Sequence, residues 1–116
     1  MNKIEFYILE NWGKVNKPLT KEYALLSHFL DDIGRYFPYH QDDTIENLKN
    51  ILKGEKTFAD IQDPEVYWSY GEGSGYFEIE GTTAFFEPDS SDAPRIVMPL
   101  AEVIEIVQEW IAFLRQ

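Results

Sequence analysis

This chain of 116 residues contains 21 acidic and 10 basic residues, which gives a formal net charge of −11 at pH 7. It has no cysteine, so disulfides, thiol catalysis and cysteine-ligated metal centres are excluded. A hydrophobic fraction of 44% is enough for a packed core, and no repeat or linker divides the sequence, so we expect a single domain over residues 1–116.

The negative charge is concentrated in the second half of the chain. Residues 1–58 carry eight Lys and Arg against nine Asp and Glu, whereas residues 59–116 carry only Arg95 and Arg115 against twelve acids. A domain with one acidic side attracts basic partners and repels nucleic acid and anionic membranes. We therefore expect a basic protein partner, and neither nucleic acid nor membrane.

The N-terminal sequence does not have the features of a secretory signal. It reads MNKIEFYILENWG and lacks a basic start, a long apolar stretch and a small-residue cleavage site. No segment approaches the roughly 20 apolar residues that span a bilayer. These observations predict a cytoplasmic protein.

The first half is predicted to contain one strand and two helices. Alternating strand formers indicate a strand over residues 4–9, and a turn is expected from Gly13 to Pro18. A helix is predicted from an N-cap at Thr20 to about Phe37, before Pro38. Its apolar stripe is Leu26, Phe29, Leu30, Ile33 and Phe37.

The second helix is predicted to begin at Asp43, with Glu46 completing a capping-box-like pair, and to end at Gly54. After a loop through Asp63-Pro64, three or four strands are expected. They cover about residues 66–70, 75–80, 82–87 and 95–98, and Glu80-Gly81 indicates a tight hairpin turn.

A last helix is predicted from Pro99, because proline is well tolerated in the first turn. Its core stripe is Leu100, Val103, Ile104, Val107, Ile111 and Leu114. The resulting order is β-α-α-β-β-β-β-α. Runs of helices and runs of strands indicate an α+β fold with a mainly antiparallel sheet of four to five strands and about three helices.

The strand over residues 76–80 is the most informative for function. Alternation places Phe77 and Ile79 on one face and Tyr76, Glu78 and Glu80 on the other. An ordinary half-exposed strand with solvated acids explains this equally well. The alternative is an acidic strip for the Lys and Arg side chains of a partner, with aromatic anchors beside it. The candidate recognition residues are Trp68, Tyr70, Glu72, Tyr76, Glu78, Glu80, Glu87 and Asp89.

The sequence does not indicate a catalytic or cofactor site. The glycine-rich segment 70–75 precedes a strand instead of a helix, has no Lys, and contains Glu72, which would repel a phosphate. His28 with Asp31 and Asp32 fits an exposed helix face better than a metal site. We therefore expect no enzyme, no catalytic residue, no metal and no cofactor.

The stretches YWSYGEGSGYFEIEGTTAFF and MPLAEVIEIVQEWIAFL, together with small size, acidity and the absence of cysteine, resemble the cytoplasmic immunity proteins of bacterial polymorphic toxins, including those of contact-dependent growth inhibition. The resemblance implies a protein that binds and neutralises a cognate toxin, foremost a basic nuclease. The alternative is a small regulatory or adaptor domain that binds another basic cellular protein. The sequence leaves both open, and also the oligomeric state.

Overall fold

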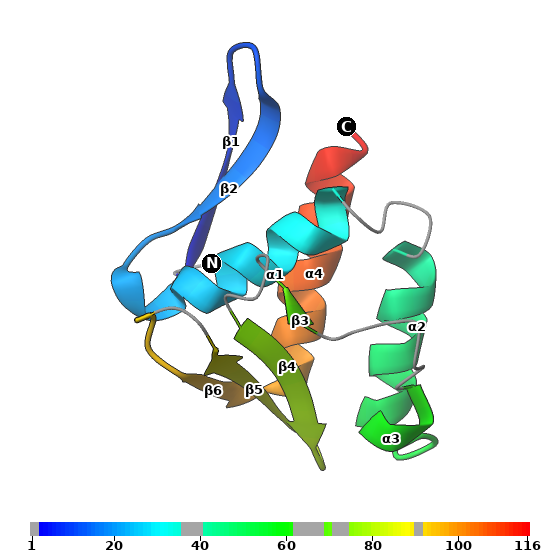
Figure 1. Cartoon of the computed structure of the whole chain (residues 1–116). Coiled ribbons are helices and arrows are strands. Elements are labelled where there is room, and N and C mark those ends of the chain that lie inside the picture. The colour runs from blue at the N-terminus through cyan, green and yellow to red at the C-terminus, as the bar shows by residue number, and fades with distance from the viewer. Residues whose placement is uncertain (1–2, 36–40, 62–68, 71–74, 90–91) are drawn as a thin grey trace.

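The computed structural model describes residues 3–35, 41–61, 69–70, 75–89 and 92–116 (Figure 1). Its fold is α+β, and all its strands pair antiparallel, as predicted. The elements in chain order are β1 (Ile4–Leu9), β2 (Gly13–Pro18), a short 3-10 helix η1 (Lys21–Tyr23), α1 (Ala24–Arg35), α2 (Gln41–Leu52), α3 (Phe58–Ile61), β3 (Ser69–Tyr70), β4 (Gly75–Glu80), β5 (Thr83–Pro88), β6 (Ile96–Pro99) and α4 (Leu100–Leu114).

The described strands form two sheets, one of two strands and one of four in the order β3-β4-β5-β6. The predicted hairpin turn is confirmed, because Glu80 pairs with Thr83 and leaves a two-residue turn. Gly81 in this turn has a φ of 61°, a conformation that glycine adopts at little cost. Of the predicted strand over 66–70, residues 66–68 lie outside the described residues, and Ser69–Tyr70 form β3.

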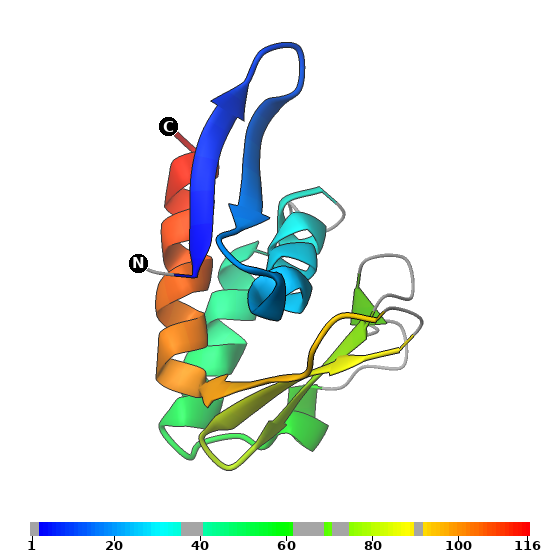
Figure 2. The same ribbon diagram turned by 90° about the vertical axis from the view of Figure 1, so that its left-hand side faces the viewer.

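The turn predicted from Gly13 to Pro18 is wrong, because these residues form β2. Their sequence, GKVNKP, lacks a strand-like alternation, and only its pairing with all six residues of β1 makes it a strand. The chain reverses direction through Asn11, whose φ is 73°. The resulting hairpin extends past the ends of the neighbouring helices (Figures 1 and 2).

Lysines fasten this hairpin to α4. The Lys14 ammonium donates hydrogen bonds to the backbone carbonyls of Leu114, at 3.2 Å, and Gln116, at 2.6 Å. Lys3, at the base of the hairpin, forms an ion pair with Glu102, and its hydrogen bond to this carboxylate raises the pKa of Lys3. The hairpin is therefore attached to α4 near both ends of this helix.

The core lies between the four-stranded sheet and the helices α1 and α4, which lie on one side of it (Figure 2). The Phe29 ring of α1 packs on Phe77 and Phe86, with ring centroids 4.7 and 5.3 Å apart. The Trp110 indole is buried and donates a hydrogen bond of 2.7 Å to the carbonyl of Leu30. Trp110 is thus a packing residue, as its place beside the core stripe of α4 indicates.

Helix boundaries differ from the predictions where tertiary contacts set them. The first α-helix begins at Ala24, because residues 21–23 form a 3-10 turn and Thr20 makes no side-chain cap. The predicted end at Phe37 lies outside the described residues. The second begins at Gln41 instead of Asp43, whereas the last begins at Leu100, with Pro99 in the N-cap position.

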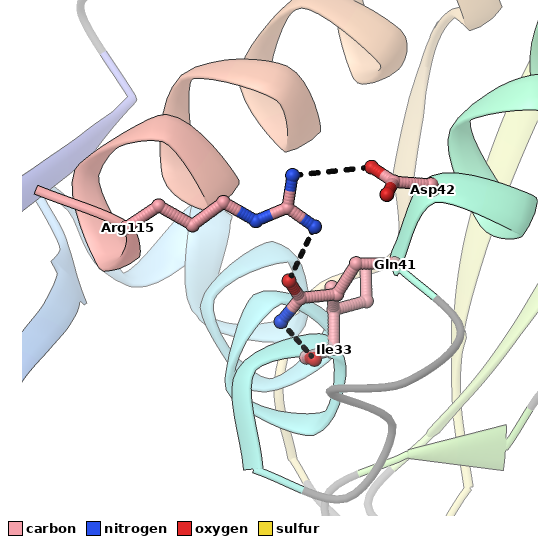
Figure 3. Close-up of polar contacts among 4 residues, drawn as sticks. All are labelled: Ile33, Gln41, Asp42 and Arg115. Carbon is pink, nitrogen blue, oxygen red and sulfur yellow. Dashed lines mark hydrogen bonds and ion pairs between the residues drawn. The ribbon is translucent and has the colours of Figure 1, made fainter.

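Contacts of Gln41 explain the early start of α2 (Figure 3). Its amide donates to the carbonyl of Ile33, at 3.3 Å, and its oxygen accepts from Arg115, at 3.2 Å. The same guanidinium donates to Asp42, also at 3.2 Å. The end of α4 thereby fixes the start of α2 against α1.

A short helix that the sequence did not predict, α3, follows α2. The backbone N–H of Thr57 donates to a carboxylate oxygen of Asp60 at 2.8 Å, which closes the first turn. This bond, with a second from the Thr57 side chain, lowers the pKa of Asp60. Phe58 then packs edge-on against Phe77, with 6.1 Å between ring centroids, so α3 is attached to the sheet.

Candidate protein-binding surface

The face of the four-stranded sheet that points away from α1 and α4 carries glutamates and apolar side chains. We call it the outer face. The alternation predicted for β4 is confirmed, because Phe77 and Ile79 are buried while Tyr76, Glu78 and Glu80 are exposed. The residues of the outer face are Tyr76, Glu78, Glu80, Phe85, Glu87 and Val97.

The strand register determines which of these side chains are neighbours. Glu78 lies directly opposite Phe85, which lies opposite Val97 on the next strand. Tyr76 lies opposite Glu87. Side chains directly opposite on one face are in contact range, so acidic and apolar groups alternate across the outer face.

Two of its apolar side chains are unusually open to solvent. Tyr76 is 40% exposed and Val97 is 53% exposed, with the half-buried Phe85 between their strands. Aromatic and aliphatic groups surrounded by charge are typical of the centre of a protein interface. Phe85 and Val97 were not among the recognition residues predicted from the sequence. The Phe85-Phe86 pair could have indicated an outward-facing aromatic ring, because consecutive residues of a strand point to opposite faces.

The acids differ in how far they are neutralised. Among the described residues, no Lys or Arg forms an ion pair with Glu78 or Glu80. Glu87, in contrast, forms an ion pair with Arg95. The Arg95 guanidinium also lies 5.0 Å from the centroid of the Phe85 ring. The uncompensated charge of the outer face is therefore that of Glu78 and Glu80.

The remaining candidate residues are only partly placed. Asp89 is exposed just beyond the end of β5. Tyr70 lies in β3, where its backbone pairs with Gly75. Trp68 and Glu72 lie outside the described residues. The structure thus brings Tyr76, Glu78, Glu80 and Glu87 together on one face.

A groove borders the outer face at the turn between β4 and β5. It has a volume of about 810 Å³ and lies between this hairpin and the end of α2 with the start of α3. Its lining residues from the helical side include Lys53, Lys56 and Phe58. Glu78, Glu80 and Phe85 belong both to the groove and to the outer face.

The face of α1 that carries His28 is less exposed than the sequence indicated, because β2 packs on this helix. Asn16 of β2 donates to Asp31 at 2.8 Å and accepts from the Ser27 hydroxyl at 2.7 Å. Nδ1 of His28 is buried and has no hydrogen-bond partner. Within the described residues, no three His, Asp or Glu side chains gather as metal ligands would.

None of the helices in the described part of the chain has the length and apolar character needed to cross a membrane. Comparisons with protein-family models, with curated proteins and with solved structures find no match to this chain. The fold and the chemistry of the outer face are therefore the basis for inferring a function.

Proposed function

We propose that this protein is an immunity protein that binds a cognate bacterial toxin, foremost a basic nuclease, and neutralises it through the outer face. The observation that carries the proposal is the pair of uncompensated glutamates, Glu78 and Glu80, beside exposed apolar side chains on the four-stranded sheet. Nuclease domains are basic because they bind phosphates, so an acidic surface of this kind complements them.

The two kinds of side chain have different roles in this proposal. The glutamates, with the net charge of −11, accelerate encounter with a basic partner. Tyr76, Phe85 and Val97 supply the apolar area that is buried in the complex, and this burial slows dissociation. Inhibition of this type requires no catalysis by the immunity protein.

A regulatory or adaptor domain that binds another basic protein is the second candidate, since the same surface suits both. A growth assay separates them. The C-terminal part of the neighbouring upstream reading frame is expressed in a host cell, alone and together with this chain. We expect growth arrest that this chain relieves. If there is no arrest, or if the chain does not relieve it, the immunity function is wrong and the adaptor function is favoured.

The double variant Glu78→Lys/Glu80→Lys tests the surface itself. We expect it to bind the toxin domain with an association rate at least about tenfold lower at low salt, and with a weaker dependence on salt, because electrostatic steering is lost. Stopped-flow measurements at several NaCl concentrations provide the rates.

The matched control is Glu105→Lys/Glu109→Lys, which changes the net charge equally. Both residues are exposed on α4, which lies on the other side of the sheet. A control that slows association as much as the outer-face variant would show that net charge, and not this face, determines the rate.

A further inference from the structure

The groove at the end of the outer face has charges of opposite sign on its two walls. Lys53 and Lys56 lie in the loop between α2 and α3, whereas Glu78 and Glu80 come from β4. Among the described residues, no ion pair joins these lysines to the glutamates, and the Lys56 ammonium donates a hydrogen bond of 3.4 Å to the side-chain oxygen of Asn47. Both walls therefore retain their capacity to bind charged groups.

Apolar side chains lie between the two charged walls. Ile51 and Ile79 are buried at its base, and Phe58 and Phe85 are half-buried beside them. Gly54 and Gly81, at the two bends that border the groove, have open space where a Cβ atom would stand. An apolar side chain can therefore enter between the walls.

The chemistry of the walls restricts the ligand. A simple anion is attracted by the lysines but repelled by Glu78 and Glu80. A polycation is attracted by the glutamates but repelled by the lysines. A polypeptide segment with an acidic group, an apolar side chain and a basic group satisfies both walls and the base together. A second copy of this chain is disfavoured as the source, because each copy carries a net charge of −11.

We propose that the groove binds an extended segment of the same basic partner, with an acidic side chain at Lys53 and Lys56, an apolar side chain over Phe58 and Phe85, and a basic side chain at Glu78 and Glu80. This inference rests on the proposed function and adds the chemistry of the partner's contact segment. Opposite charges on the two walls also fix the direction of that segment, which gives specificity among basic partners.

The double variant Lys53→Glu/Lys56→Glu tests the inference, because it strengthens the long-range attraction to a basic partner but removes the local contacts at the lysine wall. It makes the chain four charges more negative, so long-range attraction to a basic partner increases and association does not slow. The local contacts at the lysine wall are lost, so we expect dissociation from the toxin domain of the growth assay to be about tenfold faster. Surface plasmon resonance measures both rates.

The matched control is Lys17→Glu/Lys21→Glu, with the same charge change at exposed lysines of the hairpin region. If both variants bind equally well, or if the groove variant binds more tightly, the inference is wrong while the proposed function stands. If the wild-type chain neither binds the toxin domain nor relieves arrest, the proposed function fails and the inference fails with it. Thermal unfolding establishes that each variant is folded.

Reversal of the partner's charge provides a second readout. A substitution of the acidic residue in the partner segment by Lys is expected to restore binding to the groove variant and to weaken binding to the wild type. If light scattering shows that the wild-type chain forms dimers that Lys53→Glu/Lys56→Glu dissociates, the groove belongs to a second copy and the inference is overturned.

Discussion

Asn16 shows how one polar residue determines the packing of an element that has little apolar surface. Its amide group bridges Ser27 and Asp31 on α1, and it is almost fully buried. In β2, only Val15 is a strong strand former, so hydrophobic contacts alone fix the strand weakly. Buried polar groups that satisfy one another specify a single arrangement, because any other arrangement leaves them unpaired.

Replacement of Asn16 by Ala is therefore expected to lower the free energy of unfolding by about 2 kcal/mol, since the Ser27 hydroxyl loses its acceptor and Asp31 loses a donor. Urea denaturation measures the change. Lys17→Ala on the same strand is the control, because the contacts of the exposed Lys17, an ion pair with Glu5 and a cation–π contact with the Tyr7 ring, are at the surface, and we expect a cost below about 1 kcal/mol. Equal effects of the two substitutions would contradict a structural role for the polar bridge.

At the scale of elements, the periodic segments were predictable and the aperiodic ones were not. The stripe of α4 and the alternation of β4 specify their own burial, because 3.6- and 2-residue periods each define one face. β2 and α3 have no such period. They form because β1 offers hydrogen bonds to β2 and because Phe58 packs on Phe77.

The β4–β5 turn was predictable because it requires only a residue that adopts a positive φ, which is a local property of Gly81. A Cβ at Gly81 would have no atom within 4 Å, so a substitution acts only through the backbone conformation. We expect Gly81→Val to cost about 1–2 kcal/mol and Gly81→Asn less, because Asn tolerates positive φ better. Chemical denaturation of both variants provides the comparison. Equal stabilities would indicate that the turn changes its conformation without strain.

At the scale of the whole molecule, the two most exposed large apolar side chains of the described residues lie away from the uncompensated glutamates. The hairpin tip exposes Trp12 by 74% and Ile8 by 70%, because β1 and β2 continue past the end of α4. The uncompensated glutamates Glu78 and Glu80 lie on the four-stranded sheet instead. The predicted clustering of Tyr76, Glu78 and Glu80 follows from one strand, whereas the addition of Phe85 and Val97 required the register of three strands.

The large net charge predicts that salt stabilises the fold. Self-repulsion among the acids is screened at high ionic strength, so the Tm is expected to rise by a few degrees between about 20 mM and 500 mM NaCl. Differential scanning calorimetry measures it. The variant Glu105→Lys/Glu109→Lys, whose net charge is four units less negative, is expected to show a smaller rise. A Tm that falls with salt would mean that attractive ion pairs dominate.

The sequence by itself determined the fold class, the apolar faces of the long elements, the β4–β5 turn and the acidic character of the second half. These properties depend on spacing along the chain and on composition, which are local or additive. The tertiary structure alone decided that residues 13–18 form a strand, that Arg95 neutralises Glu87, and that Lys53 and Lys56 face Glu78 and Glu80 across a groove. Each of these contacts joins separate elements, so it depends on how they pack and leaves no periodic signal in the sequence.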